Sequence, residues 1–448
     1  MKMSYFPSFI RHCCFLLFFT SSAFSQQKPN IVMILVDDMG WGEVGIYGSH
    51  YCQTPHLDNL AKQGMRFTNF YANSTVCSPT RAALMTGRYP DLVGVPGVIR
   101  GNVENSWGYF SPKAVTLPQV LKTAGYRTAM VGKWHLGLEP ENHPNRHGFT
   151  HFHGFLEDMM DDYYTHLREG KNWMRLNGQV IDPSGHATDL FTQWAIEYLN
   201  TQKKNPQPFF LYLAYNAPHF PVQPPREWLE KVKKRNPNLS EKRAKLTALI
   251  EHLDESIGKV MEALRQNGQA DNTLIVFSSD NGGLLSDEAD NGIWKGGKQT
   301  MYEGGIRVPT IAVWKNKIIP GTKTDFRALT MDLFPTFCEA AGTKPPQAVD
   351  GHSFLSLLLG QPQTALNRTA FWVRREGGAY GGQEYYAVRE GNWKILQNTP
   401  FEPFQLFDMA KDSLETTDVS IAQKAIYEAL GKKLRKHIQK AGAVNWQK

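Results

Sequence analysis

Short apolar segments that alternate with helical patterns are the feature that most restricts how this 448-residue chain can fold. Four segments rich in β-branched or aromatic residues predict strands: 31–36, 127–131, 209–215 and 272–278. Four others have the apolar spacing of helices: 57–63, 117–124, 188–200 and 241–265. The alternation predicts an α/β fold with a large, mixed but mostly parallel sheet sandwiched by helices.

The pattern changes after about residue 365. Four short segments joined by Gly- and Asn-containing turns predict antiparallel strands: 371–375, 385–389, 393–396 and 405–407. A final amphipathic helix is predicted over residues 421–440. We therefore expect a large N-terminal domain over residues 26–365 and a small C-terminal subdomain over residues 366–448.

Residues 1–25 have the pattern of a secretory signal peptide. Lys2 and Arg11 are positively charged, residues 13–19 are apolar, and Ala23-Phe24-Ser25 offers a cleavage site before Gln26. No later segment reaches the roughly 18 apolar residues of a membrane span. We expect a secreted or periplasmic product without a membrane anchor; the alternative is a buried N-terminal helix.

Charge and cysteine content further limit the partners and the chemistry that the chain can have. The formal charge is +7, and no basic run is longer than Lys233-Lys234-Arg235, so we expect no nucleic-acid partner. Cleavage of the signal would leave Cys52, Cys77 and Cys338. Cys52 and Cys338 could pair, but sequence does not decide this. The odd count leaves at least one thiol spare or used for chemistry, and Cys77 is the candidate.

Polar residues follow each of the four main predicted strands. These endings are Asp37-Asp38, Gly132-Lys133-Trp134-His135, Asn216-Ala217-Pro218-His219 and Asp280-Asn281. Ligands of open α/β sheets bind at the carboxyl ends of the strands, so these groups are expected to converge on one site.

Asp37, Asp38, Asp280 and Asn281 offer hard oxygen ligands, which suit Ca²⁺ or Mg²⁺. Three crowded carboxylates would repel one another without a cation between them. The alternative is that Asp38 and Asn281 only cap the turns that follow the strands.

A helix is predicted to begin directly after Cys77, with Ser78 as N-cap and Pro79 at the first helical position. Cys77 would then face the positive end of the helix dipole, and Arg81 would add a guanidinium suited to a tetrahedral oxyanion. Considered alone, such a cysteine is more often a small buried residue.

Several motifs together resemble the type I, formylglycine-dependent sulfatases of the alkaline phosphatase superfamily. The Cys77-x-Pro79-x-Arg81 segment with Thr86-Gly87-Arg88 resembles the first signature of that family, and residues 125–135 resemble the second. Further matches follow in the family's order: Pro29-Asn30-Ile31 to Asp38, Ala217-Pro218-His219, Asp280-Asn281-Gly282, Gly296-Gly297-Lys298 and, in the C-terminal part, residues 386–389 and 406–408.

The resemblance implies a role for each motif residue. Cys77 would be oxidised to formylglycine (3-oxoalanine) by a formylglycine-generating or equivalent maturation enzyme, and its hydrate would be the nucleophile. One Ca²⁺ per chain would be held by Asp37, Asp38, Asp280, Asn281 and residue 77. Arg81 and Lys133 would stabilise the hydrate, His135 would accept its proton, and His219 and Lys298 would face the leaving oxygen. Alone, His219 and Lys298 would be ordinary surface residues.

The expected substrate is a sulfated carbohydrate, with carrageenan-type galactans or ulvan as candidates by resemblance to secreted bacterial polysaccharide sulfatases. Candidate substrate-binding residues able to meet hydroxyls or a second anion are Arg100, His143, Arg146, His147, Asp161 and Asp162. The alternative is that these are solvated surface groups.

Two rival functions remain at this stage. One is a phosphate or phosphonate ester hydrolase of the same superfamily, against which the Cys-x-Pro-x-Arg motif and single-metal set argue. The other is a non-catalytic glycan-binding relative, which would require an unmodified Cys77.

Overall fold

The computed structural model describes residues 1, 3–4, 27–363, 368–377 and 383–447. Nearly all of the predicted signal segment lies outside these residues, as does the predicted boundary between residues 365 and 366.

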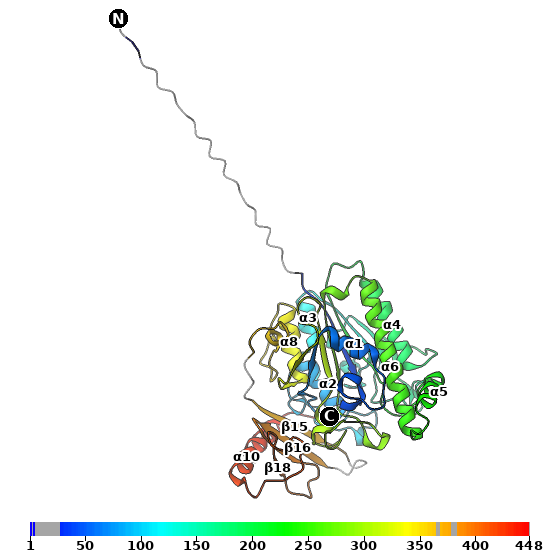
Figure 1. Ribbon diagram of the computed structural model, residues 1–448, viewed down its shortest axis with the longest axis vertical. Coiled ribbons are helices and arrows are strands. Elements are labelled where there is room, and N and C mark those ends of the chain that lie inside the picture. Colours follow the sequence, from blue (N-terminus) through cyan, green and yellow to red (C-terminus); the bar gives the residue numbers. More distant parts are fainter. Residues whose placement is uncertain (2, 5–26, 364–367, 378–382, 448) are drawn as a thin grey trace.

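A ten-stranded sheet forms the centre of the larger part of the molecule (Figure 1). Its strands, in spatial order, are β13 (Thr322–Thr324), β2 (Met65–Phe67), β12 (Thr310–Val313), β11 (Thr273–Ser279), β1 (Asn30–Val36), β10 (Phe209–Ala214), β4 (Arg127–Lys133), β5 (His151–Phe155), β8 (Met174–Leu176) and β9 (Gln179–Val180). The five from β11 to β5 are mutually parallel, whereas β12 and β8 run antiparallel to their inner neighbours. The predicted mixed, mostly parallel sheet is confirmed.

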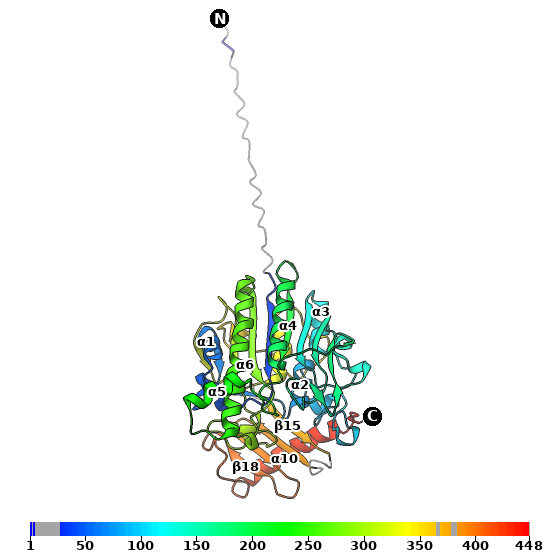
Figure 2. The same ribbon diagram turned by 90° about the vertical axis from the view of Figure 1, so that its right-hand side faces the viewer.

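Helices cover both faces of this sheet (Figure 1), and Figure 2 looks onto the face that carries α4 and α6. One face carries α1 (Pro55–Gln63), α4 (Ala187–Gln202) and α6 (Glu241–Gln266), and the other carries α2 (Cys77–Thr86), α3 (Leu117–Thr123) and α8 (Leu333–Ala340). Side chains alternate along β1, so Ile31 and Met33 enter one core while Val32 and Ile34 enter the other. This explains why the strand is apolar throughout.

Cys52 and Cys338 are not paired, because they lie in the hydrophobic cores on opposite faces of the sheet. All three described cysteines are free and buried.

The smaller part is a four-stranded antiparallel sheet made of β15 (Thr369–Arg375), β16 (Glu384–Glu390), β17 (Trp393–Gln397) and β18 (Gln405–Asp408). Val388 and Ile395 on one face pack with α10 (Lys424–Ala441), which begins three residues later than predicted. Trp372 and Leu396 on the other face pack against the larger part of the molecule. The predicted antiparallel sheet with a closing helix is confirmed.

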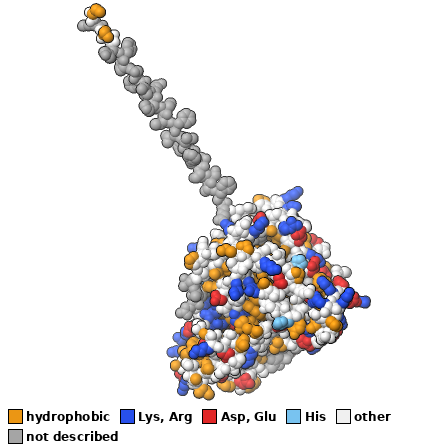
Figure 3. All heavy atoms as spheres, in the orientation of Figure 1, with side chains coloured by type: hydrophobic (Ala, Val, Ile, Leu, Met, Phe, Trp, Pro, Cys, Tyr) orange, Lys and Arg blue, Asp and Glu red, His pale blue; other side chains and the backbone are white. Residues whose placement is uncertain are grey.

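The remaining elements are short or peripheral. They are β3 (Phe70–Tyr71), β6 (Leu167–Arg168), β7 (Lys171–Asn172), β14 (Ala328–Leu329), α5 (Arg226–Arg235), α7 (Glu303–Ile306) and α9 (Leu355–Leu358). Basic, acidic and hydrophobic side chains are interspersed over the face shown in Figure 3. Within the described residues, no helix combines the length and apolar character needed to cross a membrane.

Candidate active site

Three aspartates meet where the central parallel strands end. Asp37 follows β1 and Asp280 follows its neighbour β11, so the parallel register brings both to the same edge of the sheet. One carboxylate oxygen from each of Asp37, Asp38 and Asp280 lies within 4.8 Å of the others. The amide nitrogen of Asn281 donates to Asp38 Oδ1 at 2.8 Å. The predicted convergence of these four residues is therefore present.

Cations surround the carboxylates. Arg81, fully buried on α2, donates to Asp280 Oδ2 through Nη2 at 2.7 Å and through Nε at 3.1 Å. Lys133 contacts Asp37, and Lys298 Nζ lies 2.6 Å from Asp38 Oδ2. Burial alone would raise the pKa of Asp37, but Lys133 and the other nearby cationic groups hold it well below its usual range. Burial and the neighbouring Asp37 carboxylate raise the pKa of Asp280 to about 7.

The oxygen atoms of this cluster fit a hard cation. Asp37 Oδ1 and Asn281 Oδ1 are buried and have no hydrogen-bond partner among the described residues. Buried acceptors normally have a partner, because leaving one unsatisfied costs about 1–3 kcal/mol. Three carboxylates and an amide oxygen are ligands typical of Ca²⁺ or Mg²⁺.

Cys77 lies beside this cluster at the start of α2. Its sulfur, a carboxylate oxygen of Asp37 and a ring nitrogen of His219 lie within 4.8 Å of one another. Burial raises the pKa of the Cys77 thiol to about 12, even though Lys133 and Lys298 oppose the shift. An unmodified Cys77 is therefore a thiol at neutral pH.

The prediction that Ser78 caps this helix is wrong. The N-cap is Val76, and Cys77 is itself the first helical residue. Ser78 Oγ accepts a hydrogen bond of 3.1 Å from the main-chain N–H of Ile99. This tertiary contact replaces the local capping contact.

His135 is held by the same main-chain segment. Its Nε2 lies 2.9 Å from the carbonyl oxygen of Ile99, so Nε2 carries the proton and donates to it. Nδ1 is buried without a partner among the described residues. Burial and the nearby Lys133 charge lower the pKa of His135 well below its usual value, so the neutral ring offers Nδ1 as a proton acceptor.

His219 and Lys298 complete the cluster. His219 Nδ1 donates to the Phe220 carbonyl at 2.7 Å, which directs Nε2 toward Asp38 Oδ2 at 3.6 Å. Burial and the Lys298 charge lower the pKa of His219 to about 4. The structure thus brings together all six residues predicted to be catalytic.

Comparisons with known proteins identify the family. A family model described as "Sulfatase" matches residues 29–343, and a second, described as "N-sulphoglucosamine sulphohydrolase, C-terminal", matches residues 293–443. The chain belongs to the sulfatase family. It is an enzyme of the sulfuric ester hydrolase class, as the resemblance implied.

Individual relatives cover most of this sulfatase. The N-acetylgalactosamine-6-sulfatase of Mus musculus is 35% identical over 430 residues, covering 89% of this chain and 78% of the relative. Arylsulfatase A of Homo sapiens is 32% identical over 393 residues, covering 82% and 74%. A solved structure described as Ps i-CgsB in complex with k-i-k-neocarrahexaose superposes with a TM-score of 0.85 at 32% identity, covering 94% of this chain and 95% of that one.

The residues predicted to bind substrate do not form one group. His147 is buried against Phe110 and Trp134, and Asp162 accepts hydrogen bonds from the main chain of Tyr164 and Thr165. Three more have separate environments. The His143 side chain caps a short helix, Arg146 is exposed, and Asp161 forms an ion pair with Arg168. Only Arg100 lines the large cavity described below.

Sequence reasoning missed Ile99, whose main chain contacts both Ser78 and His135. A main-chain contact can be made by almost any residue type, so the sequence carries no signal for it. It also missed the aromatic residues of the cavity wall, because they come from segments far apart in the chain.

Proposed function

We propose that this sulfatase removes sulfate from a carbohydrate, with residue 77 as formylglycine and one bound Ca²⁺. The observation that carries the proposal is the position of Cys77, whose sulfur lies within 4.8 Å of both a carboxylate oxygen of Asp37 and a ring nitrogen of His219. The residue to be modified, the candidate metal ligands and a candidate proton donor therefore share one small buried volume.

The ligands would be Asp37, Asp38, Asp280 and Asn281, together with residue 77. A bound Ca²⁺ would supply positive charge beside the oxygens of the sulfate and of residue 77, where negative charge develops. Within the described part of the chain, Asp37 and Asn281 each have a buried oxygen without a hydrogen-bond partner.

The protein's own side chains would handle the protons. One hydroxyl of the hydrated residue 77, ionised beside the Arg81 and Lys133 charges, attacks sulfur as the bond from sulfur to the sugar oxygen breaks. The sugar oxygen leaves with a proton from His219 Nε2, which the anionic substrate favours in its charged form. His135 Nδ1 then takes the proton of the second hydroxyl, the carbonyl re-forms and sulfate departs. Arg81 and Lys133 hold the hydrate, and Lys298 faces the leaving oxygen.

The formylglycine is needed because a serine or cysteine sulfate ester has no comparable exit. Its formation requires a formylglycine-generating or equivalent maturation enzyme as a partner. We also propose that the protein is secreted or periplasmic, on the basis of the signal pattern in residues 1–25.

A carrageenan-type galactan or ulvan is the proposed substrate class. The support for this class is the solved structure of a relative in complex with k-i-k-neocarrahexaose. That relative is 32% identical to this chain, and the alignment covers 94% of this chain. Because the relatives include mammalian N-acetylgalactosamine-6-sulfatases, animal glycosaminoglycans are the main substrates to test beside the algal ones.

Three measurements test this function. Mass spectrometry of the residue-77 peptide should show a mass about 18 Da below the thiol form, from replacement of CH₂SH by CHO. Sulfate release should occur from algal oligosaccharides, and a sulfate monoester should react faster than the phosphate monoester of the same alcohol. An intact thiol without activity in protein from the native host would support the glycan-binding alternative. Activity confined to small aryl sulfates would reject the polysaccharide substrate.

A further inference from the structure

A cavity of about 790 Å³ opens beside the candidate active site, in the size range of small-molecule binding sites. Ile99 lines it, and so does Gly137, two residues after His135. The main chain of Ile99 contacts His135 through its carbonyl and Ser78 through its N–H. One wall of the cavity is therefore formed by the segment that positions residues next to Cys77.

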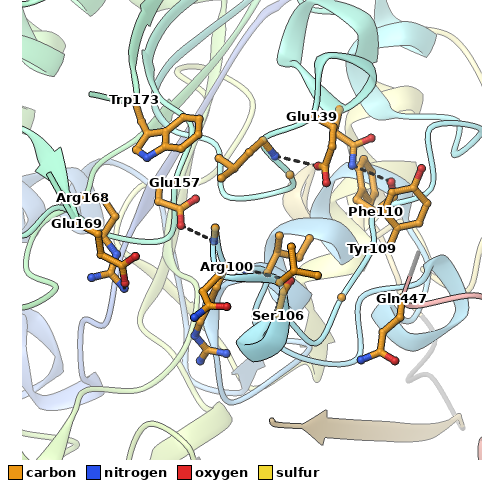
Figure 4. A pocket seen from close by; sticks show the side chains of 18 of the residues that line it. Arg100, Ser106, Tyr109, Phe110, Glu139, Glu157, Arg168, Glu169, Trp173 and Gln447 are labelled. Carbon is orange, nitrogen blue, oxygen red and sulfur yellow. Dashed lines mark hydrogen bonds and ion pairs between the residues drawn. The ribbon is translucent and has the colours of Figure 1, made fainter. Parts of the chain in front are cut away.

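The walls combine aromatic rings with acidic and basic side chains. Figure 4 shows Trp173 and Glu157 on one side, with Tyr109 and Phe110 on the other. Trp446, near the end of the chain, also lines the cavity and stacks on Trp107 with ring centroids 4.7 Å apart. Aromatic faces pack on the apolar faces of sugar rings, while carboxylates and amides bind their hydroxyls.

The charged groups of the wall are held in place. Arg168 donates to Asp158 at 2.8 Å and to Asp161 at 2.9 Å, so its guanidinium is fixed before any ligand arrives. Glu157 is buried and accepts a hydrogen bond of 2.6 Å from the N–H of Gly101. Lys171 is exposed at the cavity edge, where it can meet an anionic group.

We propose that this cavity binds the sugar rings of the substrate beyond the ring that bears the scissile sulfate. The inference rests on the proposed function and deepens it. Trp446 and Trp173 stack on the rings, Glu157 binds hydroxyls, and Lys171 pairs with a sulfate on a neighbouring ring. Such a site makes the enzyme specific for oligosaccharides rather than for single sulfated sugars.

Trp446→Ala and Lys171→Gln test the site. Trp446 is half-buried outside the helices and strands, and Lys171 is exposed, so neither change should prevent folding. Trp228→Ala on α5 is the matched control, since Trp228 is also half-buried but does not line the cavity. Binding of carrageenan, ulvan and chondroitin sulfate hexasaccharides is measured by calorimetry, and kcat/KM is measured on disaccharides and hexasaccharides of any series that is hydrolysed.

Wild type and Trp228→Ala should bind at least one hexasaccharide, and Trp446→Ala should bind it about tenfold more weakly, as expected for loss of one stacked aromatic contact. Lys171→Gln should weaken binding of the sulfated form more than that of the desulfated form. Wild-type affinity in both variants, or no binding by the wild type, would overturn the site. Variant-dependent binding without any sulfate release would instead reject the proposed function and leave the site standing.

Discussion

The guanidinium of Arg374, on strand β15, donates a hydrogen bond of 2.9 Å to the main-chain carbonyl of Gln299, the residue that follows Lys298. Two residues further on, the N–H of Met301 donates to Asn398 Oδ1 at 2.6 Å. Lys394 Nζ lies 2.9 Å from Glu303 Oε1. The C-terminal sheet therefore holds the loop that carries a candidate catalytic lysine.

Asn398→Ala should lower kcat/KM by about fivefold, because the loop loses one hydrogen bond worth about 1 kcal/mol and Lys298 becomes less well positioned. Asn398→Asp keeps the acceptor oxygen and should restore most of the activity. Gln397→Ala is the control, since its side chain bonds only within the C-terminal part among the described contacts. Equal rates for Asn398→Ala and Gln397→Ala would contradict the positioning role.

Removal of divalent cations with EGTA should abolish sulfate release and lower Tm, because Asp37, Asp38 and Asp280 are then left as crowded buried carboxylates. Calcium at 100 times its Kd should restore about 2.7 kcal/mol of stability. Asp280→Asn should lose this calcium-dependent rise in Tm, whereas Asp271→Asn, at an exposed ion pair with Lys315, should keep it. A calcium-independent Tm would reject the metal assignment.

Cys77→Ser should reduce turnover by at least about 10³-fold while substrate binding persists, because serine cannot form the hydrate. Cys52→Ser, in the core on the face of the sheet opposite α2, is the control and should keep activity. Single-turnover assays, with substrate binding measured in parallel, distinguish a loss of turnover from a loss of binding. Comparable turnover by Cys77→Ser would exclude the formylglycine mechanism.

Stability should depend on pH through Glu157. Burial and the neighbouring Asp158 raise its pKa in the folded protein to about 7, from an ordinary value of 4.5. A raised pKa means that the folded state binds the proton more tightly, so the free energy of unfolding falls as pH rises from about 4.5 to about 7. The Tm of Glu157→Gln relative to wild type should rise across this window and then level off. A constant difference would show that the Glu157 pKa is ordinary.

Lys394→Met should destabilise the protein by about 3–5 kcal/mol, because it leaves the buried Glu303 and Glu415 carboxylates without their shared cation. Lys432→Met, at an exposed position on α10, should change stability little. Urea unfolding of both variants measures the difference. A change below 1 kcal/mol in Lys394→Met would mean that other cations, such as Arg307, already compensate the cluster.

The strands at the centre of the large sheet were predictable because burial on both faces leaves continuous apolar runs. β2, β12 and β13 were missed, since segments of three or four residues carry too little periodicity. Parallel topology also predicts that the residues following four of these strands lie close together, and the structure confirms that arrangement. The roles of the six catalytic candidates remain predictions.

Other features depend on contacts that local sequence does not encode. Ser78 has the sequence pattern of an N-cap, yet its hydroxyl accepts a hydrogen bond from the main-chain N–H of Ile99. His147 was grouped with substrate residues because it lies in a polar segment, whereas packing against Phe110 makes it a core residue. The cavity wall joins Ile99, Gly137, Trp173 and Trp446, and only tertiary structure brings these together.

The hydrogen bonds that hold the Lys298 loop also set an order of assembly during synthesis. Asn398 and Lys394 leave the ribosome about a hundred residues after Lys298, so the loop lacks these two contacts while the chain is still growing. Until then it is held by earlier residues, such as Thr75, whose carbonyl accepts from the Gln299 N–H at 3.0 Å. A chain that stops before residue 394 would retain every candidate catalytic side chain and still lack two of the contacts that hold the Lys298 loop. The last fifth of the chain, which supplies none of those side chains, thus contributes the last contacts of the loop to be synthesised.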